Sequence, residues 1–167
     1  MKANKTIKLV QSAIICALVF AATWIVVPTP PFGNINLGDC MILMGALVVG
    51  GPWAVVSCAV GAALCDFAAG YTMYVPATLL IKAGMVLVML LFRKISKKPL
   101  ITVLAAVCAE LLMAAGYFVY EAWILGYGLA ALANIPFNLL QGTLNILLAI
   151  VIYGVLKKAG VLKSEER

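Results

Sequence analysis

Four carboxamide side chains recur along one apolar stretch near the C-terminal end of the chain. Asn134, Asn138, Gln141 and Asn145 are spaced by four, three and four residues, which places them on one face of a helix. Inside a membrane such groups are costly unless they have partners. The stripe predicts either hydrogen bonds that hold neighbouring helices together or, as we favour, one wall of a ligand-binding pocket.

Ionisable residues also occur within apolar segments, where a charge is costly and usually functional. Lys82 lies about two turns below the outer end of its segment, roughly 9 Å by helical rise, and Asp66 lies at a similar depth. They are a plausible pair, with Asp39 as a third candidate. Such charges either fix the helix register as a buried ion pair or contact a charged group of a substrate. Glu110, in the middle of a later segment, is expected to pair with Asn145 as the floor of the pocket.

The aromatic residues are unevenly distributed between the two sides of the membrane. All except Trp53, Phe92 and Tyr153 lie in the outer halves of their segments or in outer loops, whereas an interfacial belt should decorate both leaflets. A pocket that opens to the outside and is lined by rings that stack on a flat ligand explains this distribution. Its candidate rings are Tyr71, Tyr74, Tyr117 and Trp123. Glu121 is expected at the rim, as a solvated charge.

The elements that must position these residues are long apolar helices. The 167-residue chain is 65% hydrophobic, with a mean hydropathy of +1.13, so we predict an all-α membrane protein with a single domain, 1–167. Six transmembrane helices in one bundle are predicted, at about 7–27, 38–49, 53–69, 75–92, 100–120 and 133–156. The second is short for a crossing, so it is either tilted or part of a re-entrant hairpin with the third.

Nearly all of the Lys and Arg residues fall in three short clusters, at 2–8, 93–98 and 157–167. Short loops beside membrane spans keep such residues on the cytoplasmic side. Six spans then place both termini in the cytoplasm and a loop around 28–34 outside. This bias accounts for the net charge of +6, so we expect the cell membrane as location, a lipid bilayer as surroundings and no nucleic acid as partner.

Several catalytic arrangements are missing from the sequence. It contains no His and no G-x-x-x-x-G-K-[ST] loop for nucleotide phosphates, and its five Cys residues have no C-x-x-C spacing. No nucleophile–base pair or metal cluster can be assembled from these residue types. We therefore expect neither an enzyme nor a cofactor or metal, and we interpret the cysteines as small buried hydrophobic residues.

A stripe of small residues marks the first predicted span. Ala13, Ala17 and Ala21 recur at a spacing of four, and such faces let helices approach closely. The stripe indicates either packing within this chain or docking to another subunit.

Three stretches resemble a known family: residues 35–39 (Ile-Asn-Leu-Gly-Asp), the Gly61-x-x-x-x-Asp66 pattern, and residues 74–82, from Tyr74 to Lys82. They are similar to S components of energy-coupling factor (ECF) vitamin transporters, in the branch labelled riboflavin-type or hydroxymethylpyrimidine/pyridoxine-type. The resemblance implies a vitamin pocket near the outer surface, formed by spans four to six and outer loops. It also implies association with a transmembrane T component and two ABC-type ATPases, with the alanine stripe contacting the T component.

Together, these observations predict a capture subunit for a small aromatic nutrient of pyridine, pyrimidine or flavin type. The outer aromatics would stack on its ring, and Asn138, Gln141 and Asn145 would hydrogen-bond its edge, while Lys82 and Asp66, with Asp39, supply charge or hold the wall. One alternative is a standalone secondary transporter that uses Glu110 and Lys82 for ion coupling. Another is a membrane scaffold without a transport function.

Overall fold

The computed structural model describes residues 2–30 and 33–160, and 82% of the chain is helical. A β-hairpin interrupts the helices early in the chain, and a π-helical turn (η1) and a 3-10 segment (η2) lie before the last helix. In chain order the elements are α1 (Lys2–Thr23), β1 (Val26–Thr29), β2 (Gly33–Asn36), α2 (Gly38–Val48), α3 (Gly51–Ala68), α4 (Val75–Ile95), α5 (Pro99–Val119), η1 (Tyr120–Ile124), η2 (Gly128–Asn134) and α6 (Ile135–Lys158).

The helices agree in number and approximate position with the predicted spans. Within the described residues, five helical segments are long and apolar enough to cross a membrane, and α2 is a shorter apolar helix. The multi-helix membrane fold is therefore confirmed. A sixth crossing by α2 and the cytoplasmic position of both termini stay predictions, and residues 161–167 of the third basic cluster lie outside the described residues.

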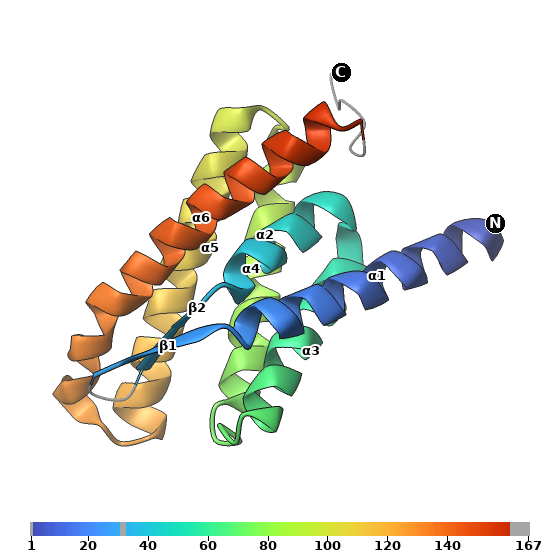
Figure 1. Ribbon diagram of the computed structural model, residues 1–167. Helices are drawn as coiled ribbons and strands as arrows, with labels where there is room; N and C mark the ends of the chain where they lie inside the picture. Colours follow the sequence, from blue (N-terminus) through green and yellow to red (C-terminus); the bar gives the residue numbers. More distant parts are fainter. Residues whose placement is uncertain (1, 31–32, 161–167) are drawn as a thin grey trace.

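The segment after the first helix is more regular than predicted. Helix α1 ends at Thr23, a few residues before the predicted end at 27, and β1 and β2 then pair as an antiparallel hairpin, with Val26 opposite Asn36 and Pro28 opposite Asn34. A two-stranded hairpin has only edge strands, so a proline there removes no hydrogen bond from a central ladder. Figure 1 shows the hairpin lying across the end of the bundle, between α1 and the lower part of α6.

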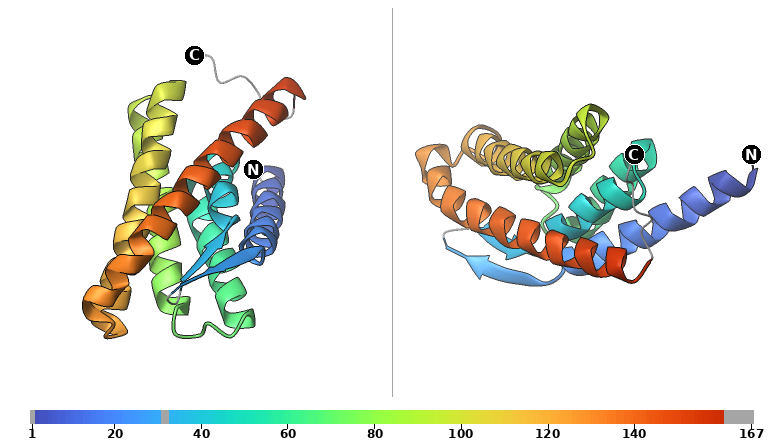
Figure 2. Two further views of the ribbon diagram at one scale, coloured as in Figure 1. Left: turned by 60° about the vertical axis from the view of Figure 1, so that its left-hand side comes forward. Right: turned by 90° about the horizontal axis from the view of Figure 1, so that it is seen from above.

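The short helix α2 is the central element of the bundle. It packs against α1, α3, α4 and α6, and most of its residues are buried. Helices α4 and α5 lie side by side, whereas α6 starts beside α5 and diverges from it toward its C-terminal end (Figures 1 and 2). Helix α1 is inclined to the rest and its N-terminal end projects away from the bundle.

Helix α1 uses one face to contact the bundle and leaves the alanine stripe outside. Ile15 and Val19 are buried against α2 and α3, whereas Ala13, Ala17 and Ala21 are all exposed. Of the two interpretations of the stripe, packing within this chain is therefore wrong.

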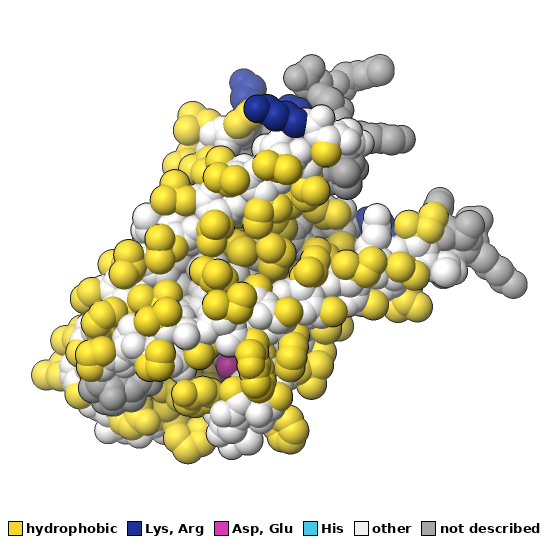
Figure 3. Space-filling view, in the orientation of Figure 1, with side chains coloured by type: hydrophobic (Ala, Val, Ile, Leu, Met, Phe, Trp, Pro, Cys, Tyr) yellow, Lys and Arg dark blue, Asp and Glu magenta, His cyan; other side chains and the backbone are white. Residues whose placement is uncertain are grey.

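The two ends of the bundle differ in chemistry. Lys and Arg gather where α4 meets α5 and where α6 ends, and the surface in between is almost entirely apolar, with an acidic side chain visible in a hollow near the hairpin end (Figure 3). An apolar belt with cations at one end is the surface expected of a membrane protein.

Close packing of α1 on α3 depends on Gly61. A Cβ added there would lie 2.5 Å from the backbone oxygen of Cys16, whereas one added at Gly154 on α6 would meet no atom within 4 Å. We expect Gly61→Ala to destabilise the fold by about 1–3 kcal/mol, because the two backbones must separate. Gly154→Ala should be neutral or slightly stabilising. Thermal unfolding of the two detergent-solubilised variants, compared with wild type, tests this; equal melting temperatures would contradict it.

Candidate binding pocket

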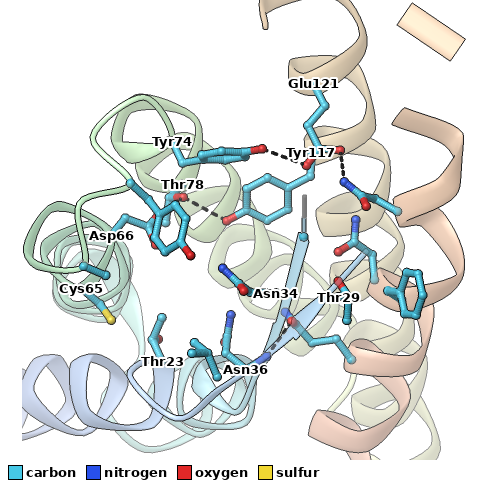
Figure 4. Close-up of a pocket in the computed structure, with 18 of the residues that line it drawn as sticks. Thr23, Thr29, Asn34, Asn36, Cys65, Asp66, Tyr74, Thr78, Tyr117 and Glu121 are labelled. Atoms are coloured by element: carbon cyan, nitrogen blue, oxygen red, sulfur yellow. Dashed lines mark hydrogen bonds between the residues drawn. The ribbon is translucent and has the colours of Figure 1, made fainter. Parts of the chain in front are cut away.

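A cavity of about 390 Å³ lies at the end of the bundle that carries the hairpin. This volume is within the range of about 300–1,000 Å³ that is usual for small-molecule sites. Figure 4 shows side chains from α1, the hairpin, α3, α4, α5 and α6 pointing into it. Its lining residues are Thr23, Trp24, Val26, Thr29, Gly33, Asn34, Asn36, Cys65, Asp66, Ala69, Tyr71, Tyr74, Thr78, Tyr117, Glu121, Asn134, Phe137, Asn138 and Gln141.

Three of the four predicted rings line this cavity as one cluster. The ring centroids of Tyr74 and Tyr117 lie 6.4 Å apart, and Tyr71 meets Tyr74 edge-on at 6.5 Å. Trp123 does not take part: its side chain is 73% exposed, and it is absent from the lining. The prediction of Trp123 as a pocket ring is therefore wrong. Trp123 lies in the π-helical turn η1, two residues after the buried Glu121 and therefore on the opposite side of the helix.

Glu121 is buried in the structure, contrary to its predicted position at the rim. Only 4% of its surface is exposed. Its carboxylate accepts hydrogen bonds from Asn134 Nδ2 at 2.8 Å and from the Tyr74 hydroxyl at 3.3 Å. Burial, and then the adjacent Glu121 carboxylate, raise the pKa of Tyr74 above its usual range, so this hydroxyl remains a donor at neutral pH. Glu121 follows Tyr117 by four residues and so shares the inward face of α5, where the tertiary fold covers it with Tyr74 and Asn134 instead of water.

A second carboxylate, Asp66, lies on the opposite wall. The Thr78 hydroxyl donates to Asp66 Oδ2 at 2.5 Å and also lies 3.0 Å from the Tyr117 hydroxyl. This chain of side chains joins α3, α4 and α5 and orients the Tyr117 ring (Figure 4). Among the lining residues, all of which belong to the described part of the chain, there are two carboxylates and no Lys or Arg.

Lys82 pairs with Asp39 rather than with Asp66. Their Nζ and Oδ1 atoms lie 2.5 Å apart, and their side chains are 4% and 0% exposed. Asp39 Oδ2 also accepts a hydrogen bond from Gln141 Nε2 at 2.6 Å. The predicted Lys82–Asp66 pair is therefore wrong, because α2 is inserted between α4 and α6 and brings Asp39 closer to the ammonium. Neither Lys82 nor Asp39 lines the cavity.

The amide stripe divides into two parts along α6. Asn134, Asn138 and Gln141 line the cavity, and Gln141 Oε1 also accepts from the backbone of Asn36 at 2.9 Å. Asn145 is fully buried below them, where its Nδ2 donates to Asn36 O and its Oδ1 accepts from Cys40 N, both at 2.9 Å. The stripe thus forms a wall at one end and a structural clamp on the β2–α2 connection at the other.

Glu110 does not pair with Asn145. Within residues 2–30 and 33–160, neither of its buried carboxyl oxygens has a hydrogen-bond partner. Its side chain lies instead against Gly142, where an added Cβ would come within 2.8 Å of Glu110 Cβ. The predicted Glu110–Asn145 floor is therefore wrong, because the amide of Asn145 is already occupied by backbone groups.

The structure also adds polar residues that the sequence analysis did not select, notably Thr23, Thr29 and Asn34. The hydroxyls of Thr23 and Thr29 and the Oδ1 of Asn134 are buried without a hydrogen-bond partner among the described residues. Such groups are costly unless something bonds to them. Thr23 ends α1 and Thr29 lies in β1, so the packing of α1 and the hairpin onto the bundle brings them to the cavity. No spacing in the sequence indicates this arrangement.

Taken together, the fold and the cavity define a helical membrane protein with a preformed cavity of small-molecule size, lined by tyrosines, amides and carboxylates. A sequence model of the family described as ECF-type riboflavin transporter, S component, matches residues 3–158. A solved structure described as the S component of a bacterial ECF transporter superposes with a TM-score of 0.79 at 21% sequence identity, covering 95% of this chain and 99% of that chain. No curated protein sequence matches this chain significantly.

The chain therefore belongs to the family of ECF-type riboflavin transporter S components, and the predicted family is confirmed. It is a substrate-binding subunit of a membrane transporter and not an enzyme. The family implies a small-molecule substrate and partner proteins of an ECF module.

The buried Asp39–Lys82 pair, which lies beneath the cavity, can be tested by substitution. Lys82→Met leaves Asp39 buried without its counter-charge, which should destabilise the protein by about 3–5 kcal/mol. Asp39→Asn/Lys82→Met removes both charges and keeps an acceptor for Gln141, so it should recover at least half of the lost melting temperature. Thermal unfolding of the purified variants measures both effects. A double variant that is no more stable than Lys82→Met would contradict a direct pair.

Proposed function

We propose that this S component captures a small, flat vitamin or vitamin precursor of pyridine, pyrimidine or flavin type at the outer face of the membrane. A T component and two ABC-type ATPases would then drive its delivery to the cytoplasm. The observation that carries the proposal is the cavity at the hairpin end, where a tyrosine cluster faces amides of α6 across a space of about 390 Å³. Tyrosine rings offer stacking surfaces, and amides offer paired donors and acceptors for a heterocycle edge.

The polar groups of the cavity favour a ligand rich in hydrogen-bond donors. Asp66 and Glu121 supply acceptor oxygens, and no Lys or Arg in the lining could balance an anionic ligand. A phosphate would be placed near the buried carboxylate of Glu121 and the half-buried carboxylate of Asp66, which like-charge repulsion disfavours. The cavity therefore suits the free vitamin, neutral or protonated, better than its phosphorylated form.

The residues predicted to contact the substrate take different roles in this proposal. Asn138, Gln141, Asp66, Tyr71, Tyr74 and Tyr117 line the cavity and would contact the ligand. Lys82, Asp39 and Asn145 are buried beneath it. Lys82 pairs with Asp39, and both Asp39 and Asn145 form hydrogen bonds with Gln141. We assign these three to holding Gln141 and the hairpin in place rather than to direct contact.

Asn138 provides the cleanest test of ligand contact by α6. Gln141 is less suitable, because it also bonds to Asp39 and to the Asn36 backbone and so supports the fold. Asn138→Leu should weaken ligand binding about tenfold or more, a loss of roughly 1.4 kcal/mol, while insertion and melting temperature stay unchanged. Thr143→Leu is the matched control, because Thr143 is on the same helix but exposed and outside the lining. Isothermal titration with riboflavin, pyridoxine and hydroxymethylpyrimidine, each with and without its phosphate, measures the effect and the preference for the free form.

Two outcomes would count against the pocket. Unchanged affinity in Asn138→Leu for the ligand that the wild type binds would make α6 structural only. Tight binding of a phosphorylated form in preference to its free form would contradict the charge argument. Mass spectrometry of the molecule that co-purifies with the wild type identifies the ligand independently.

The exposed alanine stripe of α1 is proposed to dock the T component. Ala13, Ala17 and Ala21 present a flat, apolar strip on the outside of the bundle, which lets another helix approach closely. Ala17→Phe should abolish ATP-driven uptake in vesicles that contain the whole transporter, while ligand binding by the isolated subunit is retained. Leu18→Phe, at a neighbouring exposed position, is the control. Uptake by Ala17→Phe at the wild-type rate, or uptake by the subunit alone without ATP, would contradict this assembly.

A further inference from the structure

A second cavity lies at the opposite, basic end of the bundle. It occupies about 400 Å³ between α2, α4, α5 and α6, where α6 diverges from α5 (Figure 2, left). Its lining residues are Leu43, Leu47, Met89, Arg93, Lys97, Pro99, Thr102, Val103, Ala106, Ile146, Ala149, Ile150, Tyr153, Gly154 and Lys157.

The two cavities are separated by the buried polar layer beneath the first one. On α2, Asp39 comes one turn before Leu43, which lines the second cavity; on α6, Asn145 comes just before Ile146, which lines it too. On α5, Glu110 likewise follows Ala106 by one turn. The second cavity is therefore a separate site, and changes in it need not disturb the vitamin pocket.

The interior of this second cavity is apolar. Leu43, Met89 and Ala149 are buried at its inner end, and no carboxylate or amide side chain belongs to the lining. A peptide segment placed there would leave backbone groups without hydrogen-bond partners, whereas a hydrocarbon chain has none to satisfy. The interior therefore suits an alkyl chain.

The mouth of the cavity carries three cations from three different segments. Arg93 belongs to the last turn of α4, Lys97 to the α4–α5 turn and Lys157 to the last turn of α6. Arg93 is held in position by a hydrogen bond from its Nη1 to Leu47 O at 3.1 Å. The hydroxyl residues Thr102 and Tyr153 also belong to the lining. A ligand that fits must therefore combine an apolar body with an anionic end.

We propose that this cavity binds one anionic phospholipid, with an acyl chain between α2, α4, α5 and α6 and its phosphate between Arg93, Lys97 and Lys157. Charge complementarity supports this occupant, since basic pockets between transmembrane helices bind anionic headgroups. The lipid would fill the gap where α6 leaves α5 and would couple α4 to α6 at the basic end. Inorganic phosphate would match the charge of the mouth but leave the apolar interior empty.

Gly154 allows the interior to be tested separately from the cations. A Cβ at Gly154 would meet no atom within 4 Å, so Gly154→Phe projects a ring into open space, and Gly154→Leu is a smaller second variant if the first does not fold. Val155→Phe is the matched control, because Val155 is 60% exposed and outside the lining. Lys97→Gln/Lys157→Gln removes two of the three cations.

The experiment is native mass spectrometry of the full chain in detergent, titrated with phosphatidylglycerol or phosphatidylcholine of identical acyl chains. The wild type should retain phosphatidylglycerol about fivefold better or more, and Lys97→Gln/Lys157→Gln should lose most of that preference, since each cation is worth a factor of about five. Gly154→Phe should lose the retained lipid, whereas Val155→Phe should keep it. Melting temperature and vitamin binding confirm that each variant is folded.

Three results would overturn the proposal. Equal retention of the two lipids, or a Gly154→Phe variant that keeps its lipid, would remove the lipid site. Displacement of the lipid by inorganic phosphate at equal concentration would indicate a simple anion site.

Discussion

The bundle is organised around one buried ion pair that must be satisfied without water. Lys82 and Asp39 are almost completely excluded from the surface, and in hydrocarbon an unpaired charge or polar group is far more costly than in water. Asp39 is therefore bonded on both oxygens, to Lys82 and to Gln141. These contacts tie α2, α4 and α6 together, and Asn145 extends the connection to the β2–α2 junction. The relative depth of three helices is thus fixed by a small set of directional bonds.

This polar layer divides the molecule into two chemically different halves. Toward the hairpin, tyrosines, amides and two carboxylates surround a cavity that has no cation in its lining. Toward the other end, apolar side chains surround a cavity whose mouth carries three cations. The difference fits a membrane protein, because cations gather at one side of a membrane, whereas a small-molecule cavity offers selective hydrogen bonds to its ligand. The layer keeps the two environments apart.

Helix α1 and the hairpin lie at the periphery of the bundle. Helix α1 contacts the bundle through one narrow face and leaves its alanine stripe exposed, and the hairpin closes one side of the pocket with Thr29 and Asn34. Gln141 joins the hairpin to the floor by accepting from the Asn36 backbone. A ligand that bonds to Gln141 and to the threonine hydroxyls would therefore contact both the buried polar layer and the peripheral hairpin. This arrangement suits a subunit that must hold and later release its substrate.

Much of this organisation could be predicted from the sequence, because it depends on local periodicity. The spacing of Asn134, Asn138, Gln141 and Asn145 determined which face of α6 is polar, and the lengths of the apolar runs determined the helices to within a few residues. The partner of Lys82 could not be determined in this way. Asp39 and Asp66 lie at comparable depths in their helices, and the choice between them depends on how far α2 is inserted between its neighbours.

Only the tertiary structure decided the remaining features of the site. Glu121 is buried because Tyr74 and Asn134, from other segments, meet its carboxylate, and no pattern in the sequence indicates these long-range contacts. The hairpin brings Thr29 next to Asn134, about a hundred residues away in sequence, with Gly33 in contact with both. Sequence therefore determined which side chains share a helix face, because that depends on the fixed rise and turn of a helix. Which faces meet depends on interhelical packing, and that is set by the whole bundle.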